Sequence, residues 1–179
     1  MASIIGVETL QHTNGTTAIT IDSSGFVKQN SIYVSAGVTS LQTLTTDTNT
    51  LVNFDDQIHS SGLTWDTTNK KCVFDATTAG RYMITVNLAF FSSGNNMEAC
   101  FIYPYKNNSQ FRNTICFQNG QTSTALGSLR HFCGQGHYVH NFASGDEFSV
   151  YARLDVGSSA AHIHERQYGS ELHLVRLGD

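Results

Sequence analysis

A two-residue alternation from Arg81 to Phe90 constrains the fold of this chain more than any other feature. Apolar side chains occupy every second position, namely Tyr82, Ile84, Val86, Leu88 and Phe90. The positions between them hold Arg81, Met83, Thr85 and Asn87. Successive side chains of a β-strand point to opposite faces of its sheet. The alternation therefore predicts a strand with one fully apolar face.

The residues before this strand predict a second core strand and a tight connection. Cys72, Val73 and Phe74 form a short apolar run, and Thr77 to Gly80 follows as a turn. Glycine adopts a positive φ without steric cost, so we expect Gly80 to take that conformation. The segment is thus predicted to contain two core strands joined by a glycine turn.

The spacing F-x-x-x-x-x-G-x-Y-x-I-x-V in this segment resembles the central signature of the complement globular head, a jelly roll of the tumour-necrosis-factor type. Phe74, Gly80, Tyr82, Ile84 and Val86 occupy its positions. Three further segments are similar to elements of that family: Phe101 to Asn108, with Asn108 where glycine is usual, Ala143 to Val150, and Tyr168 to Leu177. The resemblance covers roughly residues 31–179. It implies an all-β jelly-roll sandwich of about 8–10 antiparallel strands that packs as a trimer.

The N-terminal segment carries a second resemblance. Glu8 to Gly25, ETLQHTNGTTAITIDSSG, is similar to a segment at the start of bacteriophage fibre and virion surface proteins, where it often precedes a head of this kind. The resemblance implies a protein of the virion surface that is made in the cytoplasm of a bacterial host.

Composition excludes several other classes of protein. Only 13% of residues are charged and the net charge is -4, so we expect no nucleic acid partner. One proline, fifteen glycines and many Thr, Ser and Asn residues favour short strands over helices. No apolar run approaches the roughly 20 residues that span a bilayer, and the first residues do not resemble a secretory signal. We therefore expect no membrane insertion.

Residues 1–30 are predicted to form an arm outside the main domain of residues 31–179. Thr17 to Ile21 alternates like a strand, and Asp22 to Gly25 is a turn. An isolated hairpin is marginally stable in water, so the arm should need a partner surface. The candidate residues for attachment to a capsid or particle are Ile4, Ile5, Val7, Leu10, Ile19 and Ile21. The alternative is an ordinary first hairpin that packs on its own domain.

Two predicted strands carry apolar residues on both faces. One is Ala99 to Tyr105, and the other is the closing strand, where Leu172 and Leu174 alternate with partly apolar neighbours. Such strands need a second cover, which the trimer implied by the resemblance would supply. The candidate trimer-interface residues are Phe101, Tyr103, Tyr105, His173, Val175 and Leu177. The alternative is that these strands are buried within one subunit.

Four of the eight histidines form pairs, His137 with His140 and His162 with His164. Residues two apart on a strand point to one side, so a threefold axis could gather six imidazoles from His162 and His164. The His-x-His pattern is similar to iron sites in some trimeric phage fibres. These two residues are therefore the candidate transition-metal ligands, unless Val156 to Gln167 is a loop, where the alternation does not apply. No other cofactor is expected.

The sequence gives no positive sign of catalysis. Asp146 and Glu147 are adjacent on a strand and face opposite ways, and no nucleophile elbow or phosphate-binding glycine loop is present. The cysteines lack zinc-site spacing and lie among apolar strand residues, so we expect buried, reduced thiols in preference to disulfides. They are Cys72, Cys100, Cys116 and Cys133.

Three functional hypotheses follow, and none is enzymatic. The first is a structural protein of a bacteriophage virion, a trimeric capsid decoration protein or short head fibre attached through its N-terminal arm. Its partners would be itself as a homotrimer and the major capsid protein or another virion protein. The second is a tail-fibre tip that recognises a glycan or protein of the host surface. The third is a non-viral, soluble, trimeric binding module.

Overall fold

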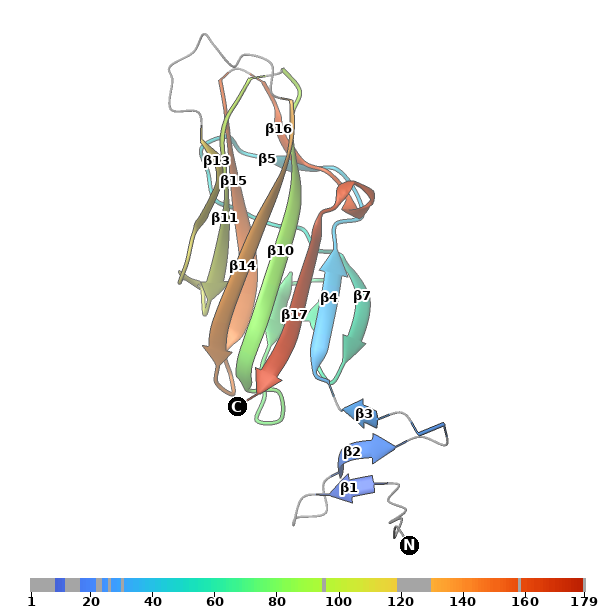
Figure 1. Ribbon diagram of the computed structural model, residues 1–179. Helices are drawn as coiled ribbons and strands as arrows, with labels where there is room; N and C mark the ends of the chain where they lie inside the picture. The colour runs from blue at the N-terminus through green and yellow to red at the C-terminus, as the bar shows by residue number, and fades with distance from the viewer. Residues whose placement is uncertain are drawn as a thin grey trace, which may run out of the picture. The chain divides into compact units, whose positions relative to one another are not determined.

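The computed structural model describes residues 9–11, 17–21, 24–25, 27–29, 31–94, 96–118, 130–157 and 159–178. The chain divides into two compact units, residues 1–31 and 32–179. The first unit contains an antiparallel sheet of β1 (Thr9–Gln11), β2 (Thr17–Ile21) and β3 (Val27–Gln29), in that order (Figure 1).

The second unit is a sandwich of two antiparallel sheets (Figure 1). We call the first of them the β10 sheet, after its central strand. Its strand order is β14 (His131–Phe142), β10 (Gly80–Ser92), β17 (Glu171–Gly178), β4 (Tyr33–Gly37) and β7 (Asp56–Ser61). Near its end β10 also pairs with β16 (Ala161–Ile163), which pairs with β5 (Gln42–Leu44).

The second sheet, the β15 sheet, covers the other side of the core. Its order is β12 (Ser109–Gln110), β11 (Met97–Lys106), β15 (Glu147–Val156), β9 (Lys71–Val73) and β8 (Trp65–Asp66). β13 (Thr114–Gln118) also pairs with β11, and β6 (Thr50–Leu51) with β15. A 3-10 turn, η1 (Arg166–Tyr168), precedes β17. The described part of the chain holds no helix of the length and apolarity that a bilayer crossing requires.

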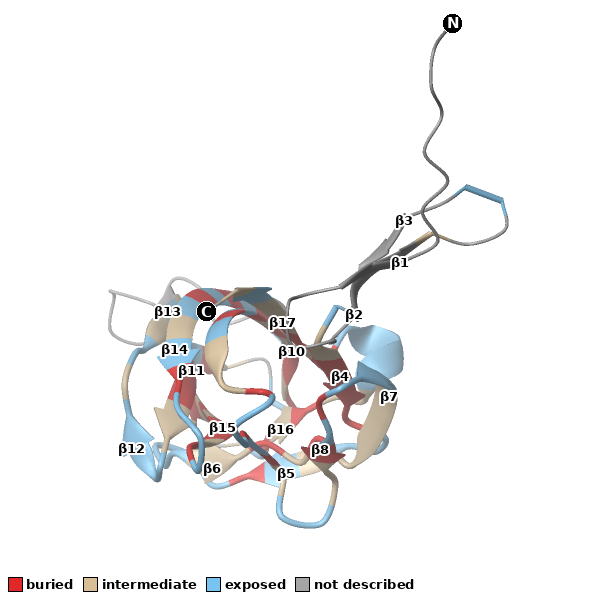
Figure 2. Cartoon of the chain, turned by 90° about the horizontal axis from the view of Figure 1, so that it is seen from below, coloured by how far each residue is buried: buried red, intermediate tan, exposed pale blue. Residues whose placement is uncertain are grey.

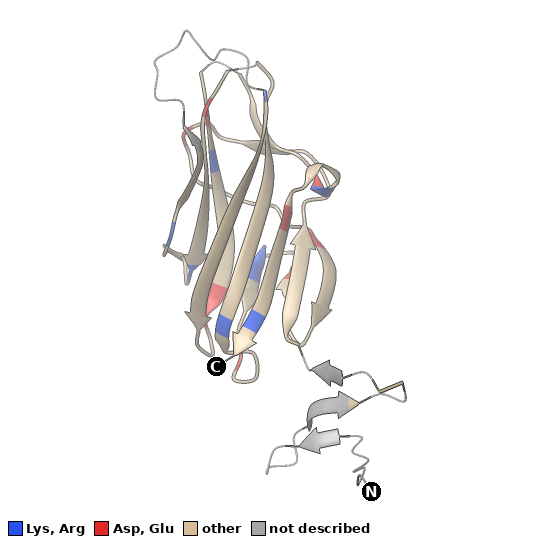
Figure 3. Cartoon of the chain, viewed as in Figure 1, with Lys and Arg blue, Asp and Glu red and all other residues tan. Residues whose placement is uncertain are grey.

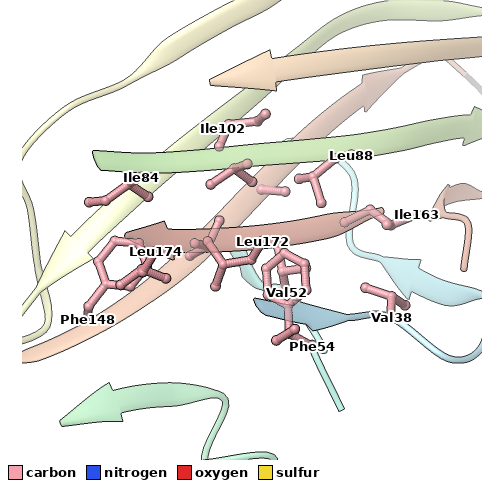
Figure 4. Packing of buried hydrophobic residues seen from close by; sticks show 14 of the residues in the cluster. Val38, Val52, Phe54, Ile84, Leu88, Ile102, Phe148, Ile163, Leu172 and Leu174 are labelled. Atoms are coloured by element: carbon pink, nitrogen blue, oxygen red, sulfur yellow. The ribbon is translucent and has the colours of Figure 1, made fainter. Parts of the chain in front are cut away.

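The core lies between the two sheets, as the view along the strands shows (Figure 2). The alternating apolar residues of β10, from Tyr82 to Phe90, are each 0% exposed, which confirms the predicted strand. They pack against inward side chains of β15, including Phe148, and of β17, including Leu172 and Leu174 (Figure 4). The expectation of an all-β sandwich is confirmed.

Gly80 has the predicted positive φ, at +145°. Its connection, however, does not join neighbouring strands of one sheet. β9 pairs with β15 and β8, whereas β10 is the centre of the opposite sheet. The turn therefore carries the chain across the core, and Phe74 fills the space between the sheets by stacking on Phe142 at 4.2 Å between ring centroids.

The four cysteines differ in burial. Cys72 and Cys100 are buried, and Cys116 is partly buried. Burial raises the pKa of the Cys72 thiol to about 12. The expectation of burial is wrong for Cys133, which is exposed because it takes an outward position on β14 between the core-facing Phe132 and Gly134.

Candidate association face

The outward side of the β10 sheet presents a wide surface that the sandwich itself does not cover. We call it the open face. Its residues alternate with the core-facing ones on each strand. They are Cys133, Gln135, His137, Val139 and Asn141 of β14; Arg81, Met83, Thr85 and Asn87 of β10; Glu171, His173, Val175 and Leu177 of β17; Tyr33 and Ser35 of β4; and His59 of β7.

An apolar band crosses this face. Val139 is the partner of Met83, and Met83 is the partner of Val175 in the ladders of β10. Val139 is 61% exposed, Met83 43% and Leu177 52%. Opposed residues of antiparallel strands lie on the same face with their side chains in reach. The band is thus a continuous apolar strip across three strands.

A second row, next to the band, is rich in histidine. Strand register places His137 opposite Thr85, and Thr85 opposite His173. The row continues through Ser35 to His59. His137 Nδ1 lies 3.3 Å from the Thr85 hydroxyl, and His173 Nε2 lies 3.3 Å from a Glu171 carboxylate oxygen. We call His137, His173 and His59 the histidine row.

The open face carries little full charge. Among the residues named above, only Arg81 and Glu171 are Lys, Arg, Asp or Glu. The register also places Asp56 of β7 in the row of Glu171, where it forms an ion pair with Arg166. In Figure 3, few positions along β14, β10 and β17 carry the colours of Lys, Arg, Asp or Glu. Neutral side chains cost less to remove from water than ions do. The composition therefore suits burial against another protein surface.

Three histidines surround Phe91 at one end of β10. The ring centroids of His131, His162 and His164 lie 4.8, 5.5 and 4.9 Å from that of Phe91. The Arg130 guanidinium lies 5.0 Å from the same ring. The two candidate metal ligands are thus brought together around Phe91: His162 lies in β16, and His164 directly follows Ile163, the buried last residue of that strand.

The electrostatics favour the neutral imidazole in two members of this cluster, His131 and His162. Burial, and then the neighbouring His164, lower the pKa of His131 and of His162. The rings of His131 and His164 stack with 12° between their planes, so their nitrogens do not converge as ligands of one metal would. Among the described residues, no group of three or more His, Cys, Asp or Glu side chains is placed to hold a metal ion. The metal site remains a prediction that needs additional copies of the chain.

The predicted trimer-interface residues fall into two separate groups. His173, Val175 and Leu177 lie on the open face, whereas Phe101, Tyr103 and Tyr105 point outward from the β15 sheet. The sheets pack face to face, so their outward sides point in opposite directions. The six residues therefore cannot form one continuous patch on a single subunit.

The aromatic residues of the β15 sheet are largely covered by their own chain. Phe101 stacks on Tyr103 at 5.9 Å, and the Arg153 guanidinium lies 5.6 Å from the Phe101 ring. Arg153 also donates hydrogen bonds of 2.5 and 2.7 Å to the two carboxylate oxygens of Asp155. Tyr103 is only 8% exposed. This strand finds much of its second cover within one subunit.

The predicted attachment residues all belong to the N-terminal unit. Ile4, Ile5 and Val7 lie outside the described residues. Leu10 of β1 pairs with Ile19 of β2, so both belong to the ladder of the small sheet. Ile21 ends β2 opposite Val27 of β3.

The part of the open face on β14 was not predicted from the sequence. Residues 131–142 do alternate between outward and core-facing positions, which is the pattern of a strand. Two of the core-facing positions hold glycine, however, so the apolar alternation is incomplete in the sequence. Both glycines are required by packing. A Cβ at Gly134 would lie 2.7 Å from Cys116 Sγ, and one at Gly136 would clash with the Tyr138 hydroxyl. His137 and Val139 were consequently not placed on a common face with Met83.

Comparison with known proteins identifies the fold. No family model matches the chain, and no curated protein matches it. Among solved structures, the Eiger TNF of S. frugiperda is similar, with a TM-score of 0.61 over 84% of this chain and 95% of that one. The two sequences are 13% identical over the match. The likeness shows that the fold of this chain is a jelly roll of the tumour-necrosis-factor type.

Proposed function

We propose that this protein is a non-enzymatic, homotrimeric surface protein whose subunits associate through the open face. The observation that carries the proposal is the apolar band, where Met83, Val139 and Leu177 are roughly half exposed on a nearly uncharged sheet. Contiguous exposed apolar surface of this kind marks interaction sites. A tumour-necrosis-factor-like jelly roll fits a trimeric binding module.

The open face is a better candidate interface than the aromatic face of the β15 sheet. Burying apolar surface contributes about 25 cal/mol per Å² removed from water. Tyr103 has little such surface left to bury, and Phe101 already packs against Arg153. Val139, by contrast, is 61% exposed and gains most from a partner.

Charged substitutions in the apolar band test the assembly. Met83→Asp and Val139→Asp should each leave a folded monomer, because an unpaired carboxylate in a desolvated interface costs roughly 3–5 kcal/mol, or at least about a hundredfold in association. The mass in solution is measured by light scattering after gel filtration. Ile115→Asp is the matched control, since Ile115 is 54% exposed but lies on β13 of the other sheet. Trimers that persist in both band variants would contradict the interface.

Within this class we propose a bacteriophage virion protein, either a capsid decoration protein or a short head fibre. The support is the resemblance of Glu8 to Gly25 to virion surface proteins. The division into residues 1–31 and 32–179 also fits an attachment segment followed by a displayed head. The arm would bind the major capsid protein or another virion protein, and many identical copies would strengthen attachment through multivalency.

Electron microscopy of phage particles that encode the chain, labelled with antibody against residues 32–179, tests the location. Label spread over the head is the expected result. Label confined to the tail end would replace decoration by the tail-fibre tip, which recognises a host glycan or protein. Particles without label would contradict a virion role and leave the soluble trimeric binding module.

A further inference from the structure

The histidine row lies in the middle of the proposed interface. His137, His173 and His59 come from β14, β17 and β7, and the register through Thr85 and Ser35 places them in one line across five strands. His137 and His59 are exposed, and His173 is partly buried, in the single subunit. The row is adjacent to the apolar band, because Thr85 follows Met83 by two residues on the same face.

Few charged groups face this row. On β10 and β14, residues 80–92 and 131–142 contain no Asp or Glu, and Arg81 is the one cationic Lys or Arg residue in those ranges. Cys133 and His131 are the other outward titratable groups of β14, and Tyr33 is that of β4. On β17, Glu171 contacts His173. On β7, Asp56 is engaged with Arg166 at 2.5 Å.

The chemistry of imidazole makes this arrangement sensitive to pH. Histidine is the side chain whose ordinary charge change falls between about pH 5 and pH 8. A neutral imidazole can be buried with a hydroxyl partner, as the Thr85 hydroxyl offers to His137. A buried imidazolium without a counter-ion is costly, and like charges brought together by association repel.

We propose that association through the open face is controlled by pH, with the histidine row releasing the trimer as the solution becomes mildly acidic. The inference rests on the proposed trimer and adds its regulation. His137 and His59 are the main contributors, because Glu171 can compensate a charge on His173 but no carboxylate of β10 or β14 faces His137. The trimer would repeat the row three times.

The direction follows from proton binding. Separated subunits accept protons on the row more readily than the trimer does, so lowering the pH favours separation. If association keeps a histidine neutral, the association constant falls about tenfold for each pH unit below the pKa of that histidine in the free subunit. We therefore expect the concentration at which half the chains are trimeric to rise at least about tenfold between about pH 7.5 and pH 5.5.

Sedimentation equilibrium of the full chain at these two pH values tests the inference. The wild type should be trimeric at the higher pH and shift towards monomer at the lower one, with an unchanged far-UV circular dichroism spectrum. The variant His59→Gln/His137→Gln/His173→Gln should lose most of this shift, because glutamine is polar but does not titrate. His140→Gln is the control on β14, since His140 points to the other side of the sheet and stacks on Phe111; it should keep the wild-type shift.

Each other result has a defined meaning. A wild type that is equally trimeric at both pH values, or a triple variant that separates like the wild type, would overturn the inference while leaving the trimer intact. Loss of the circular dichroism signal together with the trimer would also overturn it, because unfolding is not release. A wild type that is monomeric at both pH values would overturn the proposed function itself. If the triple variant does not fold, His137→Gln alone, at an exposed position, should reduce the shift, and an unchanged shift would count against the inference.

Discussion

Gly80 shows how one residue permits the crossing from one sheet to the other. Its φ of +145° is a conformation that other residues rarely adopt, and a Cβ there would lie 2.6 Å from Arg176 Nε and 2.7 Å from the Gly178 carbonyl oxygen. We expect Gly80→Ala to lower the free energy of unfolding by at least about 2 kcal/mol, from strain and the clash together. Urea unfolding followed by tryptophan fluorescence measures the change.

Gly145→Ala separates the two contributions to that loss. Gly145 has a φ of +89°, but nothing lies within 4 Å of an added Cβ. Its alanine variant should therefore show the backbone strain alone and a smaller loss of stability, about 1 kcal/mol. Equal losses at the two positions would mean that contacts with Arg176 and Gly178 contribute nothing.

At the scale of the element, the central strand was predictable because its pattern is complete. Every core position of β10 from Tyr82 to Phe90 holds a large apolar side chain, so the period of two is unmistakable. β15 was predictable for the same reason, with Phe148, Val150, Ala152 and Leu154 all buried. Strong alternation identifies a strand and its buried face without help from tertiary structure.

β14 was not predictable to the same extent, because close packing requires glycine at two of its core positions, Gly134 and Gly136. Phe90 and Cys116 fill the space where a side chain at Gly134 would lie, and the Tyr138 ring fills it at Gly136. A pattern rule scores such glycines as turn signals. At Gly134 the contacts are with Phe90 and Cys116, side chains far away in sequence that a local window does not contain.

The pairing of the strands also could not be predicted from local sequence patterns. β9 and β10 are neighbours in sequence yet belong to opposite sheets, and β10 pairs instead with β14 and β17. The family resemblance supplied the jelly roll, but the placement of individual interface candidates on one or the other outward face needed the register. This is why Tyr103 and Val175 were grouped together although they point in opposite directions.

At the scale of the whole molecule, the sandwich contains the entire described core. The buried cluster runs from Val34 to Leu174, and every described member of it belongs to residues 32–179. A domain's stability comes mainly from the apolar surface buried in its own core. The sandwich should therefore fold without the N-terminal unit, which has its own three-stranded sheet.

Deleting residues 1–31 tests this division and the attachment role together. We expect the melting temperature of the truncated protein to lie within about 2 °C of that of the full chain, because the deletion leaves the core of the sandwich complete. For a domain of this size, a loss of about 1 kcal/mol in the free energy of unfolding would lower the melting temperature by roughly 2–4 °C. It should remain trimeric by light scattering, since the open face is complete. When phage particles lacking the protein are mixed with purified full-length or truncated protein and then sedimented, only the full-length protein should be recovered with them. Equal recovery of the two forms would show that the sandwich itself binds the particle, and a truncated protein that unfolds would show that the arm belongs to the folding unit.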